Sequence, residues 1–73
     1  MKTIIDCEKN KEYKIKKLHT SGALRQRLIS FGLIKGCDIK YLKSTGMNNT
    51  YEIRVGKMSI ALRVDEANKI EVA

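Results

Sequence analysis

Short segments in which apolar and polar residues alternate recur through most of this chain. A period of two is typical of a strand with one buried face. Turn-forming residues separate several of these segments: Gly46, Asn48 and Asn49 tolerate positive φ, and Gly56-Lys57 suits a tight hairpin. The predicted strands are residues 12–18, 37–43, 50–55, 58–64 and 69–72.

The apolar positions of these strands are expected to face a common core. Leu18 breaks the alternation of the first strand, which indicates a bulge or the end of the strand. Residues 65–68 are expected to form a single helical turn that begins at Asp65. A negative side chain at the start of a helix interacts favourably with the helix dipole. The predicted inward residues are Tyr13, Ile15, Cys37, Ile39, Tyr41, Tyr51, Ile53, Val55, Met58, Ile60, Leu62, Val64, Ile70 and Val72.

One segment, Gly22–Phe31, has helical rather than strand periodicity. Leu24, Leu28 and Phe31 fall at positions i, i+4 and i+7, so they share one helix face. We expect this face to pack on the strands, with Leu28 in the core.

Residues at both ends of this segment predict where the helix stops. Thr20 or Ser21 is expected to be the N-cap, because its side-chain oxygen can accept from a free amide of the first turn. Gly32 can adopt the left-handed conformation that ends a helix, and Leu33 can then fold back on the last turn. Gly36 is assigned to the turn that leads into the next strand.

Together these elements predict a mainly β fold in one domain, residues 1–73. Small strands must protect their edges, and curling into a barrel does so compactly. The expected fold is an SH3-like β-barrel of about five antiparallel strands, with one short α-helix between the first and second strands. An OB-type barrel is the alternative, although its helix usually comes later in the order. A globule of this length has a radius of gyration of about 11 Å.

Charge and hydropathy limit the classes of partner. The chain carries 15 basic and 8 acidic side chains, a formal charge of +7, which favours an anionic partner or reflects a lysine-rich solvated surface. No apolar run exceeds three residues, whereas a bilayer-spanning helix needs roughly 20. The first ten residues contain no signal-peptide-like apolar region, so we expect a cytoplasmic protein.

Candidate catalytic and metal-binding groups are few. His19 is the single histidine, and no serine or cysteine has a base near it in sequence, so no enzymatic activity is expected. Cys7, His19 and Cys37 match no compact zinc motif. We therefore predict no catalytic residues, no metal ligands and no cofactor, and expect Cys37 to be a small buried apolar side chain. A metal carrier that uses these three side chains remains an alternative.

Nucleic-acid binding is the second alternative. Arg25 and Arg27 lie about 200° apart on a helix, so they form no single basic patch. Barrels that bind single strands present aromatic side chains for base stacking, whereas Tyr41 and Tyr51 are expected to point inward.

The stretch ALRQRLISFGLIKGCDIKYLKS resembles the signature of the ferrous iron transport protein A (FeoA) family. That family carries an Arg-x-[Arg/Lys]-Leu run, then Leu-Gly-hydrophobic-x-x-Gly and an alternating strand. The later YEIRVGKMSIALRVDEANKIEV resembles the end of the family's pattern, so the resemblance covers essentially the whole chain. The matching residues are Arg25, Arg27, Leu28, Gly32, Leu33 and Gly36.

Some positions depart from the family pattern. Lys35 stands where proline is frequent, Asn10 replaces an early glycine, and residues 44–50 lack the usual proline-containing loop. These departures leave the barrel in place but leave the contacts of the 44–50 loop undefined.

The resemblance implies a small cytosolic accessory protein of bacterial ferrous iron uptake. It implies protein contact with the large ferrous iron permease, which carries a cytosolic GTPase domain. It also implies a related possibility, an iron-responsive regulatory SH3-like domain. From the residues themselves, Arg25, Gln26, Arg27 and Ile29 are the partner-binding candidates, since arginines and exposed apolar anchors dominate many small interfaces.

Overall fold

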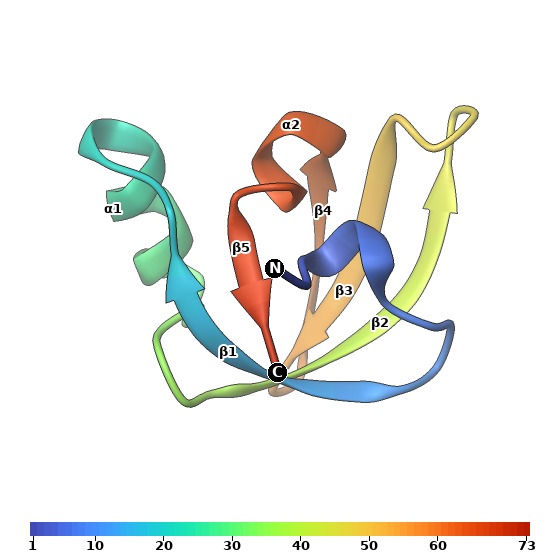
Figure 1. Cartoon of the computed structure of the whole chain (residues 1–73), viewed down its shortest axis with the longest axis horizontal. Coiled ribbons are helices and arrows are strands. Elements are labelled where there is room, and N and C mark those ends of the chain that lie inside the picture. Colours follow the sequence, from blue (N-terminus) through green and yellow to red (C-terminus); the bar gives the residue numbers. More distant parts are fainter.

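Five antiparallel strands form one sheet in the order β4-β3-β2-β1-β5, and helix α1 lies between the first two strands in sequence (Figure 1). The computed structural model describes all 73 residues. The radius of gyration is 10.8 Å, close to the expected value. The elements are η1 (Ile4–Asp6), β1 (Glu12–Leu18), α1 (Gly22–Ser30), β2 (Asp38–Thr45), β3 (Thr50–Val55), β4 (Met58–Arg63), α2 (Val64–Ala67) and β5 (Ile70–Val72).

Strand β1 bends so that its two halves pair with different neighbours. Its first half pairs with β2 and its second half with β5. A register shift between Ile15 and Lys17 lies at the bend, and Leu18 is buried at the end of the strand. A second shift falls between Tyr41 and Lys43 in β2. Bulges of this kind increase bending and twist, so they curl the sheet into the predicted small barrel.

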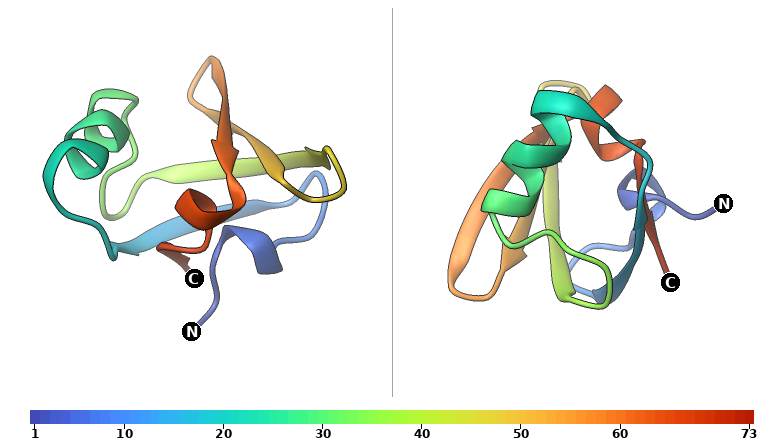
Figure 2. Two further views of the ribbon diagram at one scale, coloured as in Figure 1. Left: turned by 90° about the horizontal axis from the view of Figure 1, so that it is seen from above. Right: turned by 90° about the vertical axis from the view of Figure 1, so that its left-hand side faces the viewer.

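The barrel is open between its edge strands, β4 and β5, which do not pair with each other. The N-terminal segment lies beside β5: Thr3 forms a β-bridge with Glu71, and the amide of Val72 donates to the carbonyl of Lys2 at 2.8 Å. The two chain termini are therefore neighbours (Figure 2). Neither α1 nor α2 is long and apolar enough to span a bilayer.

The hairpin turns follow the sequence closely, with one exception. Val55 pairs with Met58, and Gly56 has φ +61°, as the first central residue of a type II′ turn requires. In the longer turn, Gly46 and Asn48 adopt positive φ as expected. Met47 also adopts positive φ, which the sequence did not indicate, whereas Asn49 does not.

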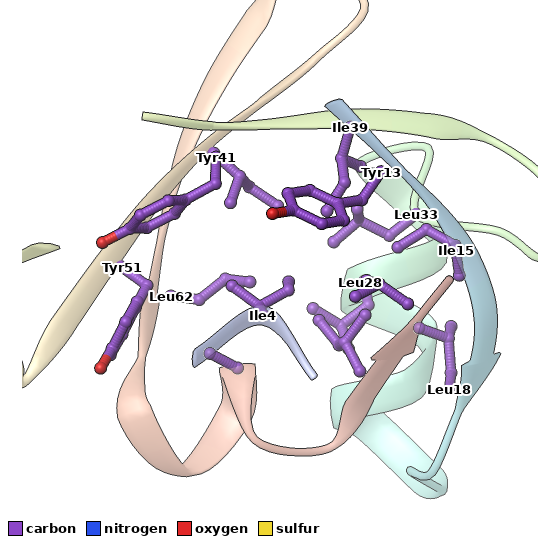
Figure 3. Packing of buried hydrophobic residues seen from close by; sticks show 14 residues of the cluster. Ile4, Tyr13, Ile15, Leu18, Leu28, Leu33, Ile39, Tyr41, Tyr51 and Leu62 are labelled. Atoms are coloured by element: carbon purple, nitrogen blue, oxygen red, sulfur yellow. The ribbon is translucent and has the colours of Figure 1, made fainter. Parts of the chain in front are cut away.

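Fourteen buried apolar residues form one core inside the curled sheet (Figure 3). Most predicted inward positions are confirmed. Met58 is an exception at 45% exposed, because it lies at the turn end of an edge strand. Cys37 is half-buried against the core rather than fully buried. The core residues are Ile4, Tyr13, Ile15, Leu18, Leu28, Leu33, Ile39, Tyr41, Tyr51, Ile53, Leu62, Ala67, Ile70 and Val72.

Helix α1 contributes a single fully buried side chain to this core. Leu28 is 0% exposed, whereas Leu24 is half-buried and packs against the edge of the cluster. Phe31 is also only half-buried and lies outside the core, which corrects its predicted role. It follows the last helical residue, and the guanidinium of Arg27 lies 5.9 Å from the centre of its ring.

The predicted reversal after α1 is present in full. Gly32 has φ +92°, its amide donates to the carbonyl of Ile29 at 2.9 Å, and the amide of Leu33 donates to the carbonyl of Leu28 at 3.0 Å. These two bonds and the buried Leu28–Leu33 pair define a Schellman motif. The amide of Gly36 then donates to the carbonyl of Ile15 at 2.8 Å, which ties the loop to β1.

We expect Leu28→Ala to lower the free energy of unfolding by about 2–5 kcal/mol, because the substitution leaves a cavity in a small core. Urea denaturation monitored by circular dichroism measures the change. The control is Ile29→Ala, which shortens an exposed side chain of the same helix. It is expected to lower the free energy of unfolding by less than about 1 kcal/mol. Equal losses for the two variants would contradict the assignment of Leu28 as the residue that anchors α1.

Candidate docking site

A groove lies where the end of β1 meets α1 and the loop that follows α1. Its volume is about 170 Å³. In Figure 2, α1 crosses the side of the barrel between the β3–β4 hairpin and β1. The groove has three aliphatic and three basic lining residues, which we call the α1 groove: Leu18, Ile29, Ile34, Lys17, Arg25 and Lys35.

Two of the three aliphatic side chains of the α1 groove are exposed. Ile29 is 38% and Ile34 is 51% exposed, and both are among the few large apolar residues at the surface. Arg25 Nη1 donates to the backbone carbonyl of Leu18 at 3.4 Å, so the guanidinium lies near the end of β1. The arrangement presents an apolar floor beside a positioned cation.

A second, more polar hollow of about 610 Å³ continues from the α1 groove toward the start of α1. It shares Lys17, Leu18 and Arg25 with the groove, and its additional lining residues include Lys69, which directly precedes β5. Lys17, Arg25, Lys35 and Lys69 make no ion pair, and no acidic side chain lines either hollow. The joined surface therefore carries uncompensated positive charge.

The four residues proposed from the sequence as a docking set do not lie together. Arg25 and Ile29 line the α1 groove, whereas Gln26 is exposed on α1 but lines neither hollow. Arg27 points toward α2, where its Nη2 lies 3.3 Å from Glu66 Oε2. Arg27 is thus positioned to tie α1 to α2.

Sequence reasoning missed the parts of the groove that come from outside α1. Lys17 and Leu18 reach it from β1, and Ile34 and Lys35 from the loop after the helix. Two signals were available: Leu18 interrupts the alternation of its strand, and Ile34 is an apolar residue in a short turn.

The start of α1 partly departs from prediction. Ser21 occupies the N-cap position with an extended backbone, but its side chain makes no capping hydrogen bond. The neighbouring Thr20 has a buried hydroxyl oxygen without a hydrogen-bond partner. Both residues line the polar hollow, so the first-turn amides of α1 lack the side-chain cap that was expected.

An ion cluster joins the end of β1 to β5 next to this hollow, which is lined by one of its members, His19. His19 Nε2 lies 2.7 Å from Glu71 Oε1, and Lys16 Nζ lies 3.5 Å from Glu71 Oε2. The hydrogen bond from His19, supported by Lys16, lowers the pKa of Glu71. The backbone amide of His19 also donates to the carbonyl of Lys69 at 2.7 Å, so the β1 end of the site is firmly connected to β5.

This lowered pKa predicts acid-dependent stability. The contribution of ionised Glu71 is present above its usual pKa of about 4.5 and is lost as the pH falls through the lowered value. Glu71→Gln should therefore be less stable than the native protein at pH 7, and this difference should shrink toward pH 3. Urea denaturation at both pH values measures it. A difference that stays constant or grows on acidification would contradict the assignment.

The sequence-derived candidates for a metal site do not come together. The structure contains no group of three or more histidine, cysteine, aspartate or glutamate side chains that could hold a metal ion. Cys7 Sγ donates to the carbonyl of Thr3 at 3.7 Å, and His19 is engaged with Glu71. Burial raises the pKa of the Cys7 thiol to about 11, which disfavours the thiolate that metals bind.

The raised pKa of Cys7 is testable by alkylation. A rise from 9.0 to about 11 lowers the thiolate fraction near pH 8 by about a hundredfold. We expect iodoacetamide to modify Cys7 much more slowly in the native protein than in urea, with peptide mass spectrometry to separate it from Cys37. Similar native and denatured rates at Cys7 would show that its thiol is not protected by the fold.

The aromatic side chains offer no platform for base stacking. All three tyrosines are buried; in Figure 3, Tyr13 points toward the middle of the cluster, and Tyr41 and Tyr51 lie together at its edge. The rings of Tyr41 and Tyr51 pack 6.0 Å apart, centre to centre. These rings stabilise the core rather than present their faces to a single strand.

The curled five-stranded sheet, with one short helix between its first two strands, is the architecture of a small SH3-like domain. The model of the FeoA domain family matches residues 2–73, so the chain belongs to this family, which is associated with ferrous iron transport. A Campylobacter jejuni relative named "Putative Fe(2+) transport protein A" is 38% identical over 55 residues, which cover 75% of this chain and 74% of the relative.

Solved structures agree on the fold. The FeoA protein of Chlorobium tepidum has a TM-score of 0.90 and 22% identity, over 97% of this chain and 68% of that one. FeoA of Stenotrophomonas maltophilia, a zinc complex described as an SH3 domain protein, has a TM-score of 0.83 and 22% identity, over 100% and 91% of the two chains.

Proposed function

We propose that this protein is a cytosolic accessory of bacterial ferrous iron uptake that binds the GTPase-containing part of a ferrous iron permease. In this proposal it works by contact rather than by chemistry of its own. The docking surface includes Arg25, Gln26 and Ile29 of α1, while Arg27 contributes indirectly by holding the helix to α2 through Glu66.

One observation carries the proposal: the exposed Ile29 lies beside a cation that has no acidic partner. Arg25 makes no ion pair and donates a hydrogen bond to the carbonyl of Leu18. Arginine is enriched among the residues that dominate binding energy, and the exposed isoleucine beside it adds apolar surface that a partner can remove from water. Family membership supports ferrous iron transport as the process in which the contact acts.

Titration of isotope-labelled protein with the cytosolic GTPase domain of a cognate permease tests the proposal. We expect amide shifts centred on Arg25, Gln26 and Ile29, at physiological salt. Small shifts spread evenly over the barrel, or no shifts at high partner concentration, would reject this domain as the target.

Matched charge reversals test the site itself. Arg25→Glu should weaken binding at least about tenfold, since loss of a central interface arginine commonly costs more than 1 kcal/mol. Lys9→Glu makes the same charge change in the turn before β1, at the opposite end of that strand from Leu18. Lys9 also makes no ion pair, so it is the control. Equal weakening by the two variants would indicate a net-charge effect and no localised docking site.

A further inference from the structure

We propose that the α1 groove and the polar hollow beside it bind a short acidic peptide segment that inserts one aliphatic side chain. The inference rests on the proposed function, because it specifies the chemistry of the partner at the same site. It adds the residues from β1 and from the loop after α1, which the helix-face proposal does not use.

The apolar part of the site suits a single side chain. The volume of about 170 Å³ is below the roughly 300–1,000 Å³ of sites for small-molecule ligands. Its floor combines Leu18, buried at the end of β1, with the exposed Ile29 and Ile34. An aliphatic side chain placed there would cover the two isoleucines and remove apolar surface from water on both partners.

The charges around this floor select an acidic segment. Lys17, Arg25 and Lys35 border the apolar floor, and Lys69 lines the adjoining polar hollow. None of the four has an acidic partner within the chain. Carboxylates on either side of an inserted aliphatic residue would therefore meet cations without first breaking an existing ion pair.

Other hollows of the molecule lack this combination. The one at the β2–β3 end contains Glu12 and Asp38 beside its basic residues, and the one near the start of α2 contains Asp65. Each of these has one apolar lining residue. Only the α1 groove and the hollow joined to it combine an aliphatic floor with basic side chains and no acidic lining residue.

The composition of the floor also favours a peptide over a nucleic acid. Single-stranded nucleic acids are held by aromatic stacking along a basic track. The floor here is aliphatic, and all three tyrosines are buried. The polar hollow instead offers room for an extended peptide backbone, with the uncapped first turn of α1 at its edge.

A synthetic peptide of the sequence Gly-Asp-Glu-Leu-Asp-Glu-Gly, blocked at both ends, is the probe. Titrated into the isotope-labelled full chain, it should shift the amides of Leu18, Ile29, Ile34 and Lys35. Replacing its leucine by serine should weaken binding roughly tenfold. Replacing its acids by the matching amides should weaken binding by at least as much, and added salt should weaken binding of the acidic peptide.

Two variants and one control test the added residues. Ile34→Ser removes an exposed aliphatic side chain, and Lys35→Glu reverses one charge of the border. Each should weaken peptide binding about fivefold or more, while Lys9→Glu should leave the localised shifts in place. Because Ile34 and Lys35 are exposed loop residues, these variants should keep the native spectrum elsewhere. Unchanged affinity in both variants would overturn the proposal.

Two further probes separate competing partners. The first probe is a short oligothymidylate, and the second is a vesicle rich in phosphatidylserine. If the protein bound either of them tenfold more tightly than it binds the peptide, the acidic-peptide assignment would be overturned. Weaker binding of both probes than of the peptide would support the assignment.

The GTPase domain separates this inference from the proposed function. Localised peptide binding without binding of the GTPase domain would retain the peptide site and reject the domain as its partner. Domain binding that shifts Arg25 and Gln26, but is unaffected by Ile34→Ser and Lys35→Glu, would retain the proposed function and overturn the peptide site.

Discussion

The backbone reversal at Gly32 connects the core of this protein to its candidate docking surface. The reversal returns Leu33 to Leu28, and both side chains become fully buried. The pair holds α1 against a core of only fourteen side chains. The same turn brings the exposed Ile34 beside Ile29 at the α1 groove. One local conformation that glycine adopts easily thus completes the core and builds the groove.

The charges of the chain divide into two groups with different roles. Some form salt bridges within the fold: Arg27 joins α1 to α2 through Glu66, and His19 joins β1 to β5 through Glu71. Exposed pairs of this kind contribute little stability individually. Lys17 and Arg25 form no salt bridge, and they border the α1 groove. The proposed binding function depends on this second group.

Much of the fold was predictable because its signals are local. Alternation locates the five strands within a few residues, and Gly32 locates the end of α1. The errors fall where a position in the tertiary structure overrides local pattern. Met58 continues an alternating face, yet it lies at the turn end of an edge strand. Phe31 continues the helical face but sits past the last helical residue, outside the core.

The candidate site was only partly predictable. Helical periodicity separates Arg25 from Arg27 and leaves Ile29 exposed, so one wall of the groove followed from the sequence. The other two walls depend on the bend of β1, which ends at Leu18, and on the return of the chain at Ile34. No sequence pattern gives the distance between these segments.

By itself the sequence determined the strand and helix segments, the turn residues and membership of the FeoA family, because each depends on residue type and spacing along the chain. Only the tertiary structure decided which basic side chains have no salt-bridge partner. Salt bridges such as Arg27–Glu66, 39 residues apart, and His19–Glu71, 52 residues apart, form between segments distant in sequence. The positive charge left without a partner, and hence the character of the docking surface, is therefore a property of the folded chain.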